Sequence, residues 1–312
     1  MPLISVIIPM RNAEPFAKAA VESVVAQEDV ELEVIVIDDG STDRSADVVR
    51  SIGDPRIRVI AGPQKGISAA FNTGLAAARG EFLARCDADD LYPPRRLQWQ
   101  LDFLLEHPEF AAISGAFTTI DARGKTIAEQ KTAGAGDVTA ELRGGRGRSH
   151  VCAYLFRTEP LRQLGGCREF FVTAEDVDLQ LRLSEIGRVW YNPRPAYLYR
   201  LHDASITHVQ RSNERAFFEK CAREFQQQRL TRGQDDLQAG NPPEVPKSKE
   251  SGATSSRQQI QRILLGQAWA AHSAGQKGEG VKLGLRVWLT NPLRPSVWRS
   301  VIALILKQPQ KA

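Results

Sequence analysis

The sequence predicts an α/β fold with a mainly parallel sheet, flanked by helices and followed by a C-terminal helical extension. Short β-branched runs alternate with stretches in which apolar residues recur at helical spacing. The expected elements alternate in type along the chain, with strands at 4–8, 32–37, 57–61 and 81–86 and helices at 15–27, 43–52 and 68–78. Such alternation is typical of parallel sheets, because each crossover connection places a helix on a face of the sheet.

We expect one domain over residues 1–230, with a first part at 1–110 and a second part at 111–230. The second part contains strand-like or extended stretches at 111–120 and 189–201 and helices at 176–186 and 213–229. Within it, the segment Arg143–Arg148 combines three arginines with three glycines. Glycines allow such a segment to move and arginines attract anions, so it is expected either to close over a phosphate group or to remain a solvated loop.

The composition changes after residue 230. Residues 231–256 are rich in Gly, Pro, Ser, Lys and Glu and contain almost no large apolar side chains, which predicts a flexible linker. Residues 257–312 form a basic amphipathic tail with helical stretches at 258–274 and 281–306, and Pro292 and Pro295 interrupt the second stretch.

From residue 281 onward, every charged residue of the tail is basic. These residues are Lys282, Arg286, Arg294, Arg299, Lys307 and Lys311. Trp and Leu side chains lie between them, and the apolar run at 301–306 is too short to cross a bilayer. This pattern is typical of a helix in an anionic membrane interface, so we expect a peripheral membrane contact through residues 281–306. A helical pair packed on the domain or on a partner subunit would show the same pattern.

The overall composition is that of a soluble globular protein, with 312 residues, 42% hydrophobic and 25% charged. A net charge of +4 is too small to indicate a nucleic-acid partner. The four cysteines show no CxxC spacing, which argues against a zinc site and fits a reducing compartment such as the cytoplasm. The N-terminal apolar run lacks a basic flank and a small-residue cleavage site, so we expect a buried strand there rather than a signal peptide.

Three polar clusters follow predicted strands: Arg11–Asn12, Asp38–Asp39 and Asp87–Asp90. Because the carboxyl ends of parallel strands meet at one edge of a sheet, these clusters are expected to line one ligand site. The second cluster could accept hydrogen bonds from a nucleoside base or ribose. Gly40 and Ser41 would also form a turn and a helix cap there without any ligand.

The third cluster, Asp-Ala-Asp-Asp at 87–90, carries the strongest indication of chemistry. Carboxylates that alternate at a strand end point toward one small volume, which suits Mg²⁺ or Mn²⁺ shared with a diphosphate. The same residues could instead form an acidic, capped helix N-terminus. An EF-hand is excluded, because Tyr92 and Gln98 occupy the loop positions that require Gly and Glu. A phosphatase with an aspartyl nucleophile would carry Thr or Val soon after its second Asp, where Asp90 and Leu91 stand here.

Several motifs together resemble the family 2 glycosyltransferases with the A-type fold. In chain order they are Ser5–Glu14, Val36–Asp43, Gly66–Gly80, Asp87–Asp90, His150–Arg157, Thr173–Arg182 and Tyr199–Thr207. The resemblance covers about residues 3–207, and their order and spacing make it specific. It implies an A-type glycosyltransferase fold, with a nucleotide-sugar-binding part at 1–110, an acceptor-binding part at 111–230 and a DxD motif at 87–89.

The resemblance also implies roles for individual residues. Asp89 would be the main carboxylate for Mn²⁺ or Mg²⁺, and His202 would approach the metal from a later segment. Asp176 would be the general base that activates the acceptor hydroxyl, and Glu175 would help to place the acceptor or the donor sugar. The donor would be contacted by residues near the strand ends, namely Pro9, Arg11, Glu14, Asp39, Asn72, Asp87 and Asp90.

At Arg11 the sequence departs from the family pattern. Members often carry an aromatic residue there, which would stack on the base, whereas a guanidinium can either stack or reach a phosphate. Uracil remains the expected base. The sequence shows neither the helices of the family's membrane-spanning synthases nor their Gln-x-x-Arg-Trp motif.

The implied function is inverting transfer of a sugar from a nucleoside-diphosphate sugar to a hydroxyl acceptor. The acceptor would be a glycan or a lipid-linked oligosaccharide in the synthesis of cell-envelope polysaccharide. A nucleotidyltransferase is one alternative, but it would require a glycine-rich basic loop where Pro9–Glu14 contains no glycine and ends in an acid. A non-catalytic nucleotide-sugar-binding protein on the same fold is the other alternative.

Overall fold

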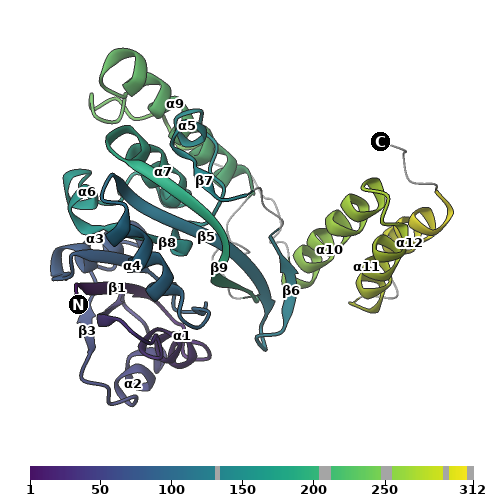
Figure 1. Cartoon of the computed structure of the whole chain (residues 1–312), viewed down its shortest axis with the longest axis horizontal. Helices are drawn as coiled ribbons and strands as arrows, with labels where there is room; N and C mark the ends of the chain where they lie inside the picture. The colour runs from purple at the N-terminus through teal and green to yellow at the C-terminus, as the bar shows by residue number, and fades with distance from the viewer. Residues whose placement is uncertain (131–133, 204–211, 247–254, 291–294, 308–312) are drawn as a thin grey trace. The chain divides into compact units, whose positions relative to one another are not determined.

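A computed structural model of the chain describes residues 1–130, 134–203, 212–246, 255–290 and 295–307. The chain divides into two compact units. The first comprises residues 1–118, 130–200 and 212–250, and the second comprises residues 119–129, 201–211 and 251–312. Figure 1 labels most of the helices and strands of the two units.

The first unit is built on a mixed sheet. Four of its strands run parallel to one another: β1 (Leu3–Met10), β2 (Glu31–Asp38), β3 (Ile57–Ala61) and β4 (Phe82–Arg85). The remaining strands include β8 (Tyr154–Arg157), β5 (Phe110–Asp121), β9 (Arg188–Leu201) and β7 (Gly136–Asp137), in the order β3-β2-β1-β4-β8-β5-β9-β7. β8 pairs antiparallel with both β4 and β5. The predicted α/β fold is confirmed, but the sheet is less parallel than expected, because an apolar run does not reveal the direction of its partner strand.

The predicted helices of the first unit are present, and three further helices, α4, α5 and α6, accompany them in the described residues. The set consists of α1 (Ala17–Val25), α2 (Ser45–Arg50), α3 (Ile67–Ala77), α4 (Arg96–Glu106), α5 (Thr139–Arg143), α6 (Thr158–Gln163), α7 (Glu175–Ile186) and α9 (Ser212–Arg232), with a 3₁₀ turn at Val151–Ala153. All four cysteines of the chain are buried free thiols in this unit.

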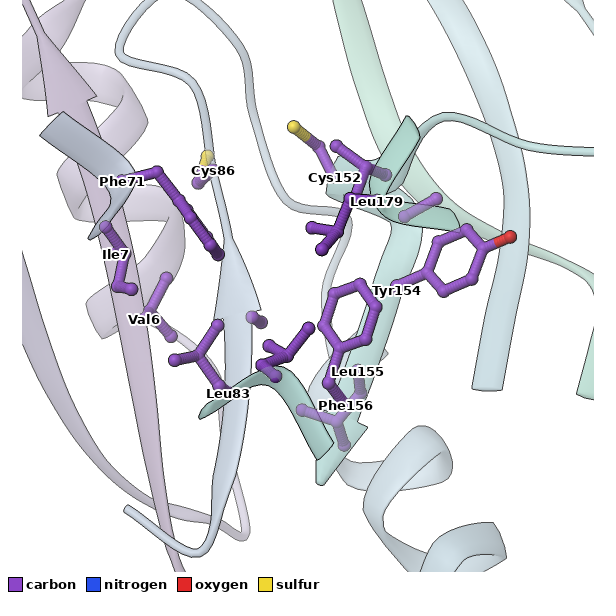
Figure 2. Close-up of a cluster of buried hydrophobic side chains, with 14 of the residues drawn as sticks. Val6, Ile7, Phe71, Leu83, Cys86, Cys152, Tyr154, Leu155, Phe156 and Leu179 are labelled. Atoms are coloured by element: carbon purple, nitrogen blue, oxygen red, sulfur yellow. The ribbon is translucent and has the colours of Figure 1, made fainter. Parts of the chain in front are cut away.

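Strands β1 and β4 lie in the main hydrophobic core. Val6 and Ile7 of β1 and Leu83 of β4 are completely buried, and Figure 2 shows them near Phe71 of α3. Helix α3 packs closely on β1 through Gly74, where a Cβ atom would lie 2.4 Å from Cγ2 of Ile7. Burial on both faces explains why these strands are continuous apolar runs in the sequence rather than alternating ones.

The carboxyl ends of β1, β2 and β4 meet at one edge of the sheet, as the sequence predicts. Met10 pairs with Asp38, and Ile7 pairs with Arg85. Beyond the paired residues, the backbone N–H of Asp39 donates to the carbonyl of Met10 at 2.8 Å. The three polar clusters therefore begin side by side at this edge.

The chain that follows α9 is held by a buried carboxylate. Asp235 is 2% exposed and accepts hydrogen bonds from Arg168, at 2.6 Å, and from Arg229. The sequence predicts a flexible linker at 231–256, but the chain around Asp235 is fixed to the first unit. Ion pairs hold it there rather than apolar contacts. Residues 247–254 lie outside the described residues.

The described part of the second unit contains α10 (Ser256–Ser273), α11 (Lys277–Thr290), α12 (Pro295–Leu306) and β6 (Thr126–Glu129). Its core consists of Leu264, Val287, Val297 and Val301. The helical stretch predicted at 281–306 is thus divided between two helices; Pro295 opens the second, and Pro292 lies in the undescribed segment 291–294. Within the described residues, no helix is both long and apolar enough to span a membrane.

The buried carboxylate of Asp235 gives a prediction for stability. Burial opposes its ionisation, but hydrogen bonds from the Gln238 backbone, Arg229 and Arg168 outweigh burial and lower its pKa. A lowered pKa stabilises the fold above the pKa of the unfolded chain, about 3.9, and this contribution is lost as the pH falls below that value. Asp235→Asn should therefore lower the free energy of unfolding by about 3 kcal/mol at pH 7, and the difference should narrow below about pH 4.

Urea unfolding of the wild type and of Asp235→Asn, at pH 7 and at pH values below about 4, measures the effect. Asp236→Asn is the control, because Asp236 is 45% exposed and lies 3.8 Å from Arg232. Equal stability of the Asp235 and Asp236 variants at pH 7 would contradict the assignment.

Candidate active site

Arg85, the last residue of β4, joins two of the predicted motifs. Its side chain is 3% exposed. Nε donates to Oδ1 of Asp87 at 2.7 Å, and Nη1 donates to Oε1 of Glu175 at 3.0 Å. The acidic cluster after β4 and the first turn of α7 are therefore linked through one buried guanidinium, although 90 residues separate Arg85 from Glu175 in the chain.

Strand β9 fixes the backbone of the loop at 87–90. The Asp87 N–H donates to the Tyr197 hydroxyl at 3.0 Å. The Arg200 N–H donates to Oδ1 of Asp90 at 2.6 Å, and Nε of Arg200 donates to the Asp89 carbonyl at 2.6 Å. Asp89 itself is partly exposed.

The three carboxyls of this loop differ in their electrostatics. Burial raises the pKa of Asp90, and the Asp89 and Asp87 carboxylates raise it further. Burial also opposes ionisation of Asp87, but Arg85 and then His150 outweigh it and lower the Asp87 pKa. Oδ2 of Asp90 is buried and accepts no hydrogen bond from the described residues. The Asp87 and Asp89 carboxylates thus place negative charge beside the buried Asp90.

This charge fits a divalent cation that a diphosphate helps to bind. Among the described residues, no three His, Cys, Asp or Glu side chains are grouped to hold a metal by themselves. Mg²⁺, however, is usually held by one or two carboxylates together with substrate phosphates. The partly exposed Asp89 and Oδ2 of Asp90, which accepts no hydrogen bond from the described residues, are groups of that kind.

The predicted base, Asp176, lies in the first turn of α7 beside Glu175. The N-cap is Ala174, in the left-handed conformation with φ of 59°, and no side chain caps the helix. Asp176 is therefore not the N-cap of α7. The helix N-terminus favours both carboxylates. Burial raises the pKa of Glu175; Arg85 lowers it and Asp176 raises it, and the net shift is upward.

The Asp176 carboxylate is 8% exposed and faces two side chains that sequence reasoning missed. Its Oδ2 lies 3.8 Å from Nε2 of His150, and its Oδ1 lies 3.8 Å from Nη2 of Arg215. Oδ1 is buried and accepts no hydrogen bond from the residues that the structure describes. His150 Nδ1 accepts a hydrogen bond from the Cys152 N–H at 3.4 Å, which places its proton on Nε2, toward Asp176.

A pocket of about 320 Å³ opens beside Asp176. Its lining includes Asp176, His150, Gln180, Arg148, Arg215 and Arg223. Gly145 and Gly147 of the arginine- and glycine-rich segment also line it. The site thus has a potential proton acceptor at the wall of a polar cavity large enough for a sugar ring.

The predicted donor-binding residues Pro9, Arg11 and Glu14 differ in burial and in their contacts. Pro9 is buried within β1, and Arg11 is exposed just beyond the strand. Glu14 accepts hydrogen bonds from the backbone N–H and from Nε of Arg44, at 3.0 and 2.9 Å. These contacts lower the Glu14 pKa and tie the two loops together.

Asp39 and Asn72 also have structural partners. Oδ1 and Oδ2 of Asp39 accept from the backbone N–H groups of Gln64, at 2.6 Å, and Gly66, at 2.8 Å, which shapes the loop before α3. The Asn72 amide makes a paired contact with the Cys167 backbone, at 2.7 and 2.8 Å. Asn72 therefore joins α3 to the loop after α6. Each carboxylate oxygen of Asp39 has a second lone pair, so Asp39 could still accept from a ligand.

His202 directly follows β9 and is partly buried. It belongs to the second compact unit, so its approach to a metal at Asp89 stays a prediction. Residues 204–207 of the same predicted motif lie outside the described residues.

Comparison with known proteins bears directly on this arrangement. A sequence profile of glycosyl transferase family 2 matches residues 5–161, about half of the chain. The chain belongs to glycosyl transferase family 2. The match contains β1 to β4 and the acidic loop, and ends before Glu175 and Asp176.

Curated relatives of this glycosyl transferase include two polysaccharide synthases. Chondroitin synthase of Pasteurella multocida (strain Pm70) is 28% identical over 207 residues, which cover 65% of this chain and 21% of the synthase. Hyaluronan synthase of Pasteurella multocida matches to the same extent. An uncharacterized glycosyltransferase of Nostoc sp. is 36% identical over 134 residues, 42% of this chain and 41% of that protein. The chain thus spans about a fifth of the length of the two synthases.

Among solved structures, TarS 1-349 of S. aureus in complex with UDP-GlcNAc has a TM-score of 0.62. The alignment covers 96% of this chain and 79% of TarS 1-349, at 18% sequence identity. A second TarS structure, in complex with UDP, has a TM-score of 0.54. This similarity confirms the predicted A-type glycosyltransferase fold with its helical C-terminal region.

The two hydrogen bonds from Arg85 to Asp87 and Glu175, here called the Arg85 bridge, give a prediction for stability. Arg85→Gln should leave Asp87 and Glu175 without their shared cation and lower the free energy of unfolding by about 3–5 kcal/mol. Arg79→Gln is the control, because Arg79 pairs with the buried Glu33 but is itself 66% exposed, and its loss should cost at most about 1 kcal/mol. Guanidinium unfolding of both variants measures the difference. If Arg85→Gln is no less stable than Arg79→Gln, the bridge does not hold the two motifs together.

Proposed function

We propose that this family 2 glycosyltransferase transfers a sugar, with inversion, from a UDP-linked donor to a hydroxyl group of an acceptor. The observation that carries the proposal is the Arg85 bridge, which holds the acidic loop and the Glu175–Asp176 pair in one site. The pocket beside Asp176 supplies space for an acceptor.

The donor would bind at the carboxyl ends of β1, β2 and β4. Pro9, Arg11 and Asp39 would line the nucleoside part, and the loop at 87–90 would face the diphosphate. The UDP and UDP-GlcNAc complexes of TarS support a uridine nucleotide. We also propose Mn²⁺ or Mg²⁺ as cofactor, held by Asp89 with support from Asp90. When bound, such a cation offsets the negative charge that gathers on a leaving diphosphate.

Transfer with inversion is a single displacement at the anomeric carbon. The acceptor oxygen forms a bond to that carbon while the bond from the carbon to the diphosphate oxygen breaks. The acceptor hydroxyl loses its proton in the same event, and Asp176 would take it. His150 and Arg215, each 3.8 Å from an Asp176 oxygen, would stabilise its negative charge, and Glu175, fixed by Arg85, would position the sugar. Asp176 Oδ1 suits this role because it is buried and accepts no hydrogen bond from the described residues.

We propose that the acceptor is a growing glycan, a lipid-linked oligosaccharide or another precursor of a cell-surface polysaccharide. The two synthases among the relatives support this class of product. The four free thiols support a reducing compartment, the cytoplasm, as the place of the reaction.

A nucleotide-sugar panel tests the function directly. The full chain with Mn²⁺ should release nucleoside diphosphate from at least one UDP-sugar, and release should accelerate when oligosaccharide acceptors are added. Release of pyrophosphate instead would identify a nucleotidyltransferase. Donor binding without turnover for any sugar or acceptor would identify a non-catalytic binding protein.

For the base, we expect Asp176→Asn to lower kcat by about 10²–10⁴-fold, because the amide cannot take a proton. Affinity for the UDP-sugar, measured by calorimetric titration, should stay within about twofold of the wild type, since the change removes a step after binding. An unchanged kcat would assign the base to another residue, and Glu175→Gln would then be tested in the same assay.

For the metal, we expect Asp89→Ala to abolish turnover and to remove the dependence of donor binding on Mn²⁺. The melting temperature should stay near that of the wild type, because the Asp89 side chain is partly exposed. Asp29→Ala, at a carboxylate that is 60% exposed and far along the chain from the loop, is the control for loss of one acidic side chain. Full activity of Asp89→Ala in the presence of a chelator would refute the metal role.

A further inference from the structure

Arg215, on α9, has hydrogen-bond donors that the protein leaves unused. Its Nε donates to Oε1 of Glu219 at 3.0 Å. Nη2 lies 3.8 Å from Oδ1 of Asp176, too far for a hydrogen bond. The two terminal nitrogens therefore donate to no residue that the structure describes. The side chain is 35% exposed, and it lines the pocket beside Asp176.

The other two arginines of the pocket are already engaged. Arg148 is paired with Glu141 through two nitrogens and donates with Nη1 to the Gly134 carbonyl at 3.2 Å. Arg223 donates to the Gly145 carbonyl at 3.2 Å and to Glu219. Because Arg223 holds Glu219, and Glu219 holds Nε of Arg215, the terminal edge of Arg215 is fixed in orientation toward the pocket.

We propose that Arg215 binds an anionic group of the acceptor, a phosphate or a carboxylate, beside the hydroxyl that Asp176 activates. This inference rests on the proposed function of the pocket. The terminal edge of a guanidinium presents two parallel N–H groups, which match two oxygens of a carboxylate or phosphate.

Small probes test the proposal without knowledge of the natural acceptor. With UDP bound, the full chain is titrated with methyl glucuronide, glycerol 3-phosphate and the neutral methyl glucoside, and binding is followed by ligand-observed NMR. At least one anionic probe should bind about tenfold or more tightly than methyl glucoside. The stronger of the two identifies carboxylate or phosphate as the recognised group.

Two variants connect the preference to Arg215. Arg215→Gln should remove the preference for the anionic probe over methyl glucoside. Arg215→Lys should restore this preference in part, because lysine keeps the charge without the planar pair of donors. Arg146→Gln removes the same charge from an exposed residue of the neighbouring loop and should leave the preference intact. The wild type and the three variants should bind UDP with equal affinity. If the wild type does not bind UDP, the result counts against the proposed function and not against the role of Arg215. Equal binding of charged and neutral probes, or an unchanged preference in Arg215→Gln, would overturn the inference.

A second, independent observation concerns α12 in the second unit. One face of this helix is buried through Val297, Val301 and Leu304. The opposite face exposes large apolar side chains, with exposed fractions of 44% for Trp298, 48% for Ile302, 46% for Ile305 and 74% for Leu306. The Trp298 ring also packs against Trp288, with centroids 5.2 Å apart, but the row as a whole remains substantially exposed, which is unusual for a surface that meets only water.

Basic side chains accompany this row. Arg299 and Lys307 are exposed on or next to α12, and Lys282 and Arg286 are exposed on α11 beside Leu285, which is 44% exposed. The sequence holds no acidic residue from 281 to 312. We infer that the apolar row of α12 inserts into an anionic lipid surface, with these basic side chains at the headgroups. Charge complementarity favours this occupant over a second copy of the same basic helix.

Vesicle flotation with the full chain tests this inference. The protein should float with phosphatidylglycerol-containing vesicles at low salt, should float less with pure phosphatidylcholine, and should dissociate as salt screens the charges. Ile302→Glu with Ile305→Glu should abolish flotation, and Leu230→Glu, an equally exposed leucine of the first unit, should not affect it. Arg286→Gln with Arg299→Gln should weaken binding by about fivefold per charge. If the wild type stays unbound at low salt, or if Ile302→Glu with Ile305→Glu still floats, the inference is wrong, and a dimer in sedimentation would identify a second copy as the occupant.

Discussion

The arrangement of the site depends on one buried guanidinium. Arg85 ends β4 and donates to Asp87 on one side and to Glu175 on the other. Burial makes either carboxylate costly without a partner, and the one guanidinium donates a hydrogen bond to each of them. The loop that would face the diphosphate and the helix that carries the base are thereby held at a fixed separation. From β9, Arg200 donates two hydrogen bonds to the same loop, and the Tyr197 hydroxyl accepts one from it. The loop is therefore held by the antiparallel strand β9 as well as by the parallel strand β4.

Much of this site could be predicted from the sequence. Parallel strands bring their carboxyl ends to one edge, so Arg11, Asp38 and Asp87 could be grouped from the alternation of strands and helices alone. Arg85 carried a signal as well, since a charged residue at the end of an apolar strand requires a buried partner. The identity of that partner, Glu175, could not be read, because nothing local links residues 90 positions apart. The same applies to Arg215 and His150, which approach Asp176 only after α7, α9 and the 3₁₀ turn pack together.

One residue type can serve the fold and also bind a ligand, and sequence patterns do not separate these uses. Asn72 and Glu14 have the polar side chains of binding residues, yet the structure uses Asn72 to hold the Cys167 backbone and Glu14 to hold Arg44. Composition alone likewise suggested flexibility after residue 231, because few apolar side chains are present. The buried Asp235 carboxylate between Arg168 and Arg229 holds that segment by charge instead. Such ion pairs form between residues that the fold brings together, and amino-acid composition carries no information about which residues those are.

The central claim is that the acidic loop and Asp176 act on one bound donor. A crystal structure of the full chain with Mn²⁺ and a non-transferable UDP-sugar analogue tests it most directly. The account predicts the diphosphate against the loop at 87–90, with Asp89 nearest the cation, and the anomeric carbon turned toward the pocket that Asp176 lines. A nucleotide bound away from the carboxyl ends of β1, β2 and β4, or a sugar that points away from Asp176, would contradict it.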